Sequence, residues 1–288
     1  MALRPRLDPF LWSSLILITS QTFTLYVASR EKHFWETYQI TPPQISLQLP
    51  LLYFFGSVVL LGAILLLVPV NKLRMVFRIM FTFLFAWGMF ITLVLSLSIL
   101  AASLISVAGA LMWLLRPRVW LHNLLMIFTL ASVGAVFGSL LSPWTAISFM
   151  LVISVYDILA VRFGYMLWMV KRLSESGVLP AFVIPKRISA WNLSLKEAGF
   201  KKLFEDDSAE REFSILGGGD IGFPLLLVVS VFFVYGFASA SVVATFSLLG
   251  LISAYLIQLF PLKGKPMPAL PPITFVSLIG FLIVYFCI

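Results

Sequence analysis

The sequence predicts an all-α polytopic membrane protein with nine transmembrane helices, and two observations support this fold class. Of the 288 residues, 61% are hydrophobic and only 11% are charged, a composition that soluble globular domains do not have. Apolar runs of about 20 residues, the length that an α-helix needs to cross a bilayer, recur along the whole chain. They indicate helices rather than a β-barrel, because a helix satisfies its own backbone hydrogen bonds inside the bilayer.

The expected spans divide the chain into three parts of one integral membrane domain. The tract 75–115 is too long for one helix, so a turn near Ser96–Ser103 is expected to divide it into two spans. The spans cover about residues 10–28, 45–70, 75–115 (two spans), 119–141, 144–170, 216–237, 242–260 and 269–288. The parts are therefore helices one to six (1–170), a charged cytoplasmic loop (171–213), and helices seven to nine (214–288).

The distribution of basic residues predicts the orientation of the helices. Seventeen of the 20 Lys and Arg residues fall before the first span or in alternate loops, and eight of them lie in the loop 171–213. Loops rich in Lys and Arg stay in the cytoplasm. The N-terminus is therefore expected inside the cell, and nine crossings put the C-terminus outside.

Composition also excludes several classes of function. One cysteine, Cys287, allows neither an internal disulfide nor a cysteine-based metal site. The net charge of +8 resides mainly in loops between apolar spans, where it sets topology, so nucleic-acid binding is not expected. No metal and no organic cofactor is implied.

Two acidic residues lie inside the predicted spans. Of the twelve Asp and Glu residues, all but Asp157 and Asp220 fall near the N-terminus, in the first loop or in the charged tract. A carboxyl group inside a membrane helix costs about 2.5–3.5 kcal/mol on insertion scales, so its presence indicates a function. Spans six and seven run in opposite directions, which brings the two acids to similar depths.

Two such carboxyl groups can support two kinds of function. Facing each other in a low dielectric they cannot both ionise easily, so the pair shares one proton. In an aspartic protease one carboxylate takes a proton from water and the other acid protonates the scissile carbonyl oxygen. A proton- or cation-coupled transporter uses the same chemistry, and depth and spacing alone leave both open. A transporter usually shows paired broken helices in its two halves, and a counterpart of the Gly-rich start of span seven is missing from the first half.

Three short motifs resemble those of the presenilin family of intramembrane aspartyl proteases. They are Tyr156-Asp157 in span six, Gly217-Gly218-Gly219-Asp220 at the start of span seven and Pro268-Ala269-Leu270 at the start of span nine. In the family these are the YD, GxGD and PAL motifs, and here they occur in the same order and on the same spans. The resemblance implies a presenilin-like fold and an intramembrane endopeptidase that cleaves transmembrane segments of other proteins.

The resemblance also assigns roles to single residues. It implies that Asp157 and Asp220 are catalytic and activate a water molecule. Tyr156 would lie beside them, the motif glycines would let a substrate backbone approach Asp220, and the Pro268–Leu270 segment would hold substrate. Family members often carry a large apolar residue at the position of Gly218, so glycine there is expected to loosen the start of span seven.

The loop 171–213 is short, as in the archaeal members of the family. This likeness implies a multi-pass protein of an archaeal cell membrane that works without accessory subunits. Before Gly217, residues 212–216 alternate polar and apolar side chains, as a strand does. We expect an unwound substrate to add as a strand beside residues 212–216 and to rest against Leu270. Without substrate this lone strand is expected to be unstable.

Overall fold

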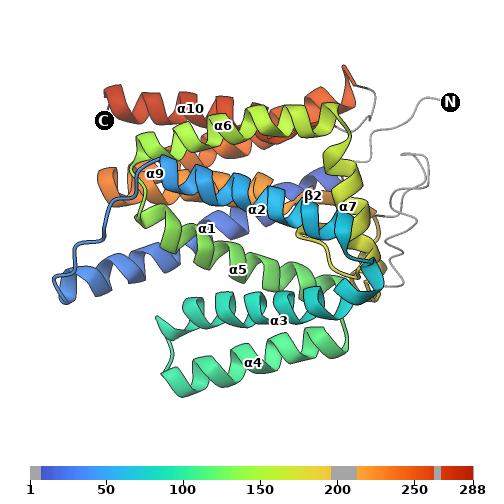
Figure 1. Ribbon diagram of the computed structural model, residues 1–288. Coiled ribbons are helices and arrows are strands. Elements are labelled where there is room, and N and C mark those ends of the chain that lie inside the picture. Colours follow the sequence, from blue (N-terminus) through green and yellow to red (C-terminus); the bar gives the residue numbers. More distant parts are fainter. Residues whose placement is uncertain (1–7, 196–212, 263–266, 288) are drawn as a thin grey trace.

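The computed structural model describes residues 8–195, 213–262 and 267–287, and this part of the chain is a bundle of long helices (Figure 1). The helices are α1 Asp8–Thr37, α2 Gln48–Leu67, α3 Val70–Val94, α4 Ile99–Leu115, α5 Val119–Ser139, α6 Pro143–Arg162, α7 Tyr165–Glu175, α9 Gly218–Leu259 and α10 Leu270–Cys287. By length and composition, seven of the described helices can cross a membrane, and α4 is a shorter apolar helix of 17 residues. The all-α prediction is confirmed, whereas nine crossings and their orientation stay predictions.

Helix α9 accounts for two of the expected spans. Its 42 residues would measure about 63 Å as one straight helix, roughly twice the apolar thickness of a bilayer. The helical conformation is interrupted at Gly236, whose φ of 84° and ψ of −177° suit a residue without Cβ. The two halves on either side of Gly236 match the expected spans seven and eight.

Serine residues set the start of two helices. The Ser98 side chain accepts a hydrogen bond from the backbone N–H of Ala101 at the start of α4, and Ser142 accepts one from Thr145 at the start of α6. The expected turn within residues 75–115 is therefore confirmed and lies between Val94 and Ile99.

The boundaries of two predicted spans were wrong. Span six was expected to reach Val170, but α6 ends at Arg162 because Gly164 adopts φ 72°, and the separate helix α7 follows. The first span was expected to end near Ala28, but α1 continues to Thr37. Glu31, expected in a loop, therefore lies on α1, where Ser139 donates a 3.4 Å hydrogen bond to its carboxylate.

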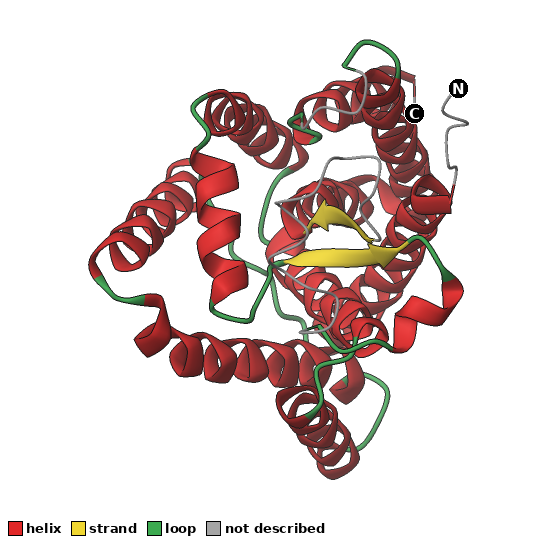
Figure 2. Ribbon diagram, turned by 90° about the vertical axis from the view of Figure 1, so that its right-hand side faces the viewer, coloured by secondary structure: helices red, strands yellow, loops and turns green. Residues whose placement is uncertain are grey.

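A small sheet closes one end of the bundle. Strand β1 (Ala181–Pro185) pairs antiparallel with β2 (Phe213–Gly217), and Val183 lies opposite Ile215. Figure 2 looks onto this end and shows both strands across the centre, surrounded by helices. The strand expected over 212–216 is thus present, but it is not alone, because β1 pairs with it; Glu212 lies outside the described residues.

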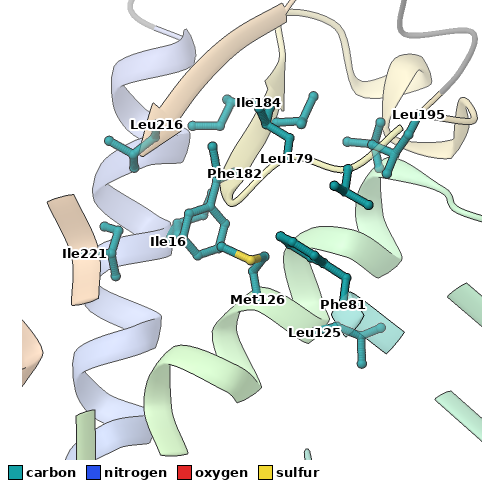
Figure 3. Close-up of a cluster of buried hydrophobic side chains, with 14 of the residues drawn as sticks. Ile16, Phe81, Leu125, Met126, Leu179, Phe182, Ile184, Leu195, Leu216 and Ile221 are labelled. Atoms are coloured by element: carbon teal, nitrogen blue, oxygen red, sulfur yellow. The ribbon is translucent and has the colours of Figure 1, made fainter. Parts of the chain in front are cut away.

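The sheet is anchored in the largest apolar cluster that the described residues form. Phe182 is fully buried and points toward Met126 of α5 and Ile16 of α1 (Figure 3). All five residues of β1 are buried, so the part of the charged tract nearest α7 is built into the fold. The other part of that tract, residues 196–212, lies outside the described residues, as do Lys263 and Lys265.

The helix ends that border the predicted cytoplasmic loops lie at the same end of the bundle as the sheet. The starts of α3, α5, α9 and α10 and the ends of α4 and α6 lie there (Figure 1). The described start of α1 lies at this end and the described end of α10 at the opposite one, as an odd number of crossings requires.

Candidate active site

Asp157 lies on α6 and receives a hydrogen bond from another helix. Its side chain is 9% exposed. The backbone N–H of Leu270 donates to the Asp157 carboxyl group. Because α10 begins at Leu270, this N–H has no acceptor within its own helix. One turn earlier on α6, Ser154 donates a 2.8 Å hydrogen bond to the Thr274 hydroxyl, which ties the two helices together beside Asp157.

Asp220 lies in the first turn of α9 and receives its hydrogen bond from the adjoining strand. The donor is the backbone N–H of Gly217, the last residue of β2. A Cβ atom on Gly217 would lie 2.9 Å from the Asp220 Oδ2, so any side chain there would press on the carboxyl group. Asp220 is half-buried and interacts electrostatically with Asp157. The fold thus brings together two acids that are 63 positions apart in the sequence.

A cavity of about 350 Å³ lies against Asp220. Its wall includes residues 214–220, Met166 and Met169 of α7, Gln258 near the end of α9, and Ala269. Asp157, which interacts electrostatically with Asp220, is not one of the residues that line this cavity. The cavity therefore joins the end of β2, one carboxyl group and the segment before α10.

The other motif residues pack around the two acids. Gly218 is buried, and its N–H donates a 3.0 Å hydrogen bond to the Pro180 carbonyl oxygen. A Cβ atom on Gly218 would lie 2.9 Å from that oxygen, so the chain is closely packed where a looser start of the span was expected. Gly219, in contrast, is exposed.

Tyr156 and Leu270 border the acids on the apolar side. The ring of Tyr156 lies edge-on to Phe54 and Phe55 of α2, with centroids 5.5 Å and 5.8 Å away. Leu270 is 2% exposed and packs in a buried cluster with Phe149 of α6. Pro268 and Ala269 are half-buried in the segment before α10. The structure thus brings the three motifs together at one end of the bundle.

Sequence reasoning missed strand β1 and the two residues that hold it. Asn123 of α5 bonds both backbone groups of Val183, and His122 of α5 lies 3.0 Å from the Ala181 carbonyl oxygen. The run Phe182-Val183-Ile184 between Pro180 and Pro185 was the available signal, because β-favouring residues bounded by prolines are typical of a short strand.

The hydrogen bonds of Val183 identify which edge of the sheet is open. In an antiparallel pair, alternate residues direct their N–H and C=O to opposite sides. Because Val183 faces α5, its neighbours Phe182 and Ile184 face β2 and pair with Leu216 and Ser214. Ile215 and Gly217 therefore direct their backbone groups away from β1. Among the described residues this edge of β2 has no partner strand, and it ends beside Asp220; we call it the free edge of β2.

Comparisons with known proteins identify the family of the chain and the likeness of its fold. The family model described as signal-peptide peptidase, presenilin aspartyl protease matches residues 38–288. Two solved structures of a presenilin family intramembrane aspartate protease, in C222 and P2 crystals, share the fold with TM-scores of 0.65 and 0.64. Each is 19% identical to this chain and covers 96% of it, and the matches span 98% and 97% of the solved chains. A search of curated proteins finds no significant match.

The family match extends over most of the chain and includes every motif residue named above. The chain belongs to the signal-peptide peptidase and presenilin family of aspartyl proteases and is a multi-pass, intramembrane-cleaving enzyme of that family.

Proposed function

We propose that the protein hydrolyses peptide bonds within transmembrane helices of other membrane proteins, with Asp157 and Asp220 as its catalytic pair. The observation that carries the proposal is the meeting of these two acids from different helices, each with one backbone N–H donor. The family assignment favours this function over a proton- or cation-coupled transporter that would use the same two acids.

The chemistry follows from one proton shared by two carboxyl groups. The ionised acid removes a proton from a water molecule, whose oxygen attacks the scissile carbonyl carbon, while the protonated acid gives its proton to the carbonyl oxygen. Collapse of the tetrahedral intermediate breaks the C–N bond, and a proton passes to the leaving nitrogen. The oxygen of the new carboxyl group comes from water, and the two carboxyl groups supply the proton transfers at the water and at the carbonyl oxygen.

The substrate must unwind before it can be cut, because a helix buries its own backbone groups. In an apolar environment the exposed groups then need new partners. The edge of β2 that faces away from β1 offers them at Ile215, close to Asp220, whereas the Gly217 N–H already donates to the Asp220 carboxyl group. In this proposal the substrate strand lies in the cavity along residues 214–217, and Leu270 supports the site from the side of Asp157 with its backbone N–H.

Purified protein in detergent, incubated with a single-span reporter, tests the proposed function. Product masses should place the cut within the apolar segment of the reporter, toward its cytoplasmic end. An Asp157→Asn protein prepared in the same way is the control and should leave the reporter intact. Because no accessory subunit is added, cleavage would also support independent action. A reporter that stays whole with the wild-type protein over a range of lipids would contradict the proposal.

A further inference from the structure

The outer edge of β1 is occupied by two side chains instead of a third strand. The Asn123 amide nitrogen donates to the Val183 carbonyl oxygen at 2.7 Å, and the Val183 N–H donates to the Asn123 Oδ1 at 3.0 Å. The His122 Nε2 lies 3.0 Å from the Ala181 carbonyl oxygen, within hydrogen-bond distance. Asn123 is 3% exposed and His122 is fully buried, so water does not compete for these bonds.

Asparagine is suited to this place because its amide carries the same donor and acceptor as a peptide group. It satisfies both backbone groups of Val183, as an adjacent strand would. A long apolar helix thus replaces the missing strand, and an incoming strand finds only the free edge of β2 open in the described sheet.

The start of α5 also holds the chain that follows β1. The Val119 N–H donates to the Leu193 carbonyl oxygen at 3.1 Å, and the Leu195 N–H donates to the Pro117 carbonyl oxygen at 2.8 Å. Arg118 donates a 2.7 Å hydrogen bond to the Asn192 side chain. The segment 181–195 is therefore fixed to α5 at both of its ends.

We propose that Asn123, assisted by His122, is a positioning residue that determines which peptide bond of the substrate is cut. This inference rests on the proposed function. Asn123 fixes β1, β1 fixes the register of β2, and β2 in turn places the substrate strand against Asp220. A strand advances about 3.3 Å per residue, so a small displacement of the sheet brings a different peptide bond to the acids.

Three variants separate positioning from simple structural support. Asn123→Leu removes both hydrogen bonds to Val183 with little change in size. His122→Phe removes the contact with Ala181 and keeps an aromatic ring between Phe85 and Trp113, whose rings lie 5.7 Å and 6.1 Å from that of His122. Ser132→Ala is the matched control, because Ser132 is also buried on α5 but bonds only the Thr129 carbonyl oxygen of its own helix.

The expected readout is a change in the ratio of products cut at neighbouring bonds, measured by mass spectrometry on the single-span reporter. Asn123→Leu should raise the share of displaced cuts at least about fivefold, which is the effect of a single lost hydrogen bond, because both bonds to Val183 are removed. Its kcat should fall about tenfold through misalignment, with a smaller change in KM. His122→Phe should shift the ratio less in the same direction, and Ser132→Ala should match the wild type.

Hydrogen exchange of residues 181–185 and 213–217 supplies a measurement that needs no activity. In the Asp220→Asn background, Asn123→Leu should speed exchange in both strands, and Ser132→Ala should not. Unchanged exchange would overturn the inference, and so would faster exchange with an unchanged product ratio. If Asn123→Leu does not fold, the product ratio and the hydrogen exchange of His122→Phe test the inference in its place. A wild-type protein that cuts no reporter would instead overturn the proposed function, and with it the assignment of a cleavage register.

Discussion

The two acids differ in how the fold holds them. Asp157 lies within α6, and its hydrogen-bond donor comes from the start of α10, more than 100 residues later in the sequence. Asp220 lies in the first turn of α9, and its donor, Gly217, is three residues away at the end of β2. One acid is thus positioned by the packing of two helices, the other by a local strand-to-helix turn.

Because of this difference, the residues around Asp157 and those around Asp220 are expected to respond differently to substrate. The contact between α6 and α10, with the Ser154–Thr274 hydrogen bond beside it, holds Asp157 without any contribution from β2. Gly217 belongs to the free edge of β2, where we propose that substrate binds. Substrate binding would therefore alter the surroundings of Asp220 first.

The largest effect should come from replacing either acid. Because both acids are needed for one reaction, we expect the two replacements to have equal effects in spite of the different surroundings of Asp157 and Asp220. Asp157→Asn and Asp220→Asn each keep the size of the side chain but cannot exchange the shared proton. We expect each to lower kcat by at least about a thousandfold, measured as product formed from the reporter. Both proteins should still insert and purify, because a neutral side chain in the membrane is less costly than an acid. A single variant with near wild-type turnover would refute the assignment of the pair.

The next effect tests the local turn at Asp220. Gly217→Ala places a Cβ atom 2.9 Å from the Asp220 Oδ2, so the carboxyl group must move. A displacement of this kind is expected to lower kcat about 10- to 100-fold. Gly222→Ala, on the same helix, is the matched control, since its Cβ atom would meet only the end of the Leu130 side chain, at 3.3 Å. Equal activities of the two variants would show that Asp220 does not depend on this turn.

The pH dependence tests whether the acids act as a pair in spite of their different surroundings. At low pH both carboxyl groups are protonated and no base is available, whereas at high pH both are ionised and no acid is available. A plot of kcat/KM against pH should therefore be bell-shaped, with kcat/KM falling by up to about tenfold per pH unit on each side of the optimum. The measurement is initial rate on the reporter in a series of buffers. A flat profile, with chemistry shown to limit the rate, would speak against a shared proton.

The smallest effect concerns Tyr156 beside Asp157. Tyr156→Phe keeps the edge-on contacts with Phe54 and Phe55 and removes only the hydroxyl group. We expect kcat/KM to change less than about fivefold, because ring packing and not the hydroxyl holds this side of the site. Tyr156→Ala should lose more, through lost packing. A large loss in Tyr156→Phe would mean that the hydroxyl group contacts substrate or an acid directly.

Sequence reasoning found the helices and the two acids for one physical reason. Long apolar runs have few alternatives to membrane helices, and an acid within such a run is costly enough to stand out, as Asp157 and Asp220 do. The end of α6 was misplaced because an apolar run continues past Gly164, and hydrophobicity does not report the left-handed conformation adopted there.

The supports of the site were harder to predict. Strand β1 has five residues in a tract of mixed charge, and its outer partners are the side chains of Asn123 and His122 on a distant helix. Because side chains of a helix, and not another strand, bond the outer edge of β1, the sequence contains no strand pattern for that partner. The donors to the acids, Leu270 and Gly217, act through backbone N–H groups that any residue except proline possesses, so their identity carries little information.

The interruption at Gly236 has a consequence for how this enzyme is assembled during synthesis. Both ends of α9 line the same cavity, at Asp220 and at Gln258, so its two halves return to one side of the bundle as a hairpin. The described sequence between those residues contains no Asp, Glu, Lys or Arg, which allows the hairpin to enter the bilayer as a unit. Entry in this way would leave Asp220 near the surface from which it came, and its carboxyl group would not have to cross the apolar centre of the membrane.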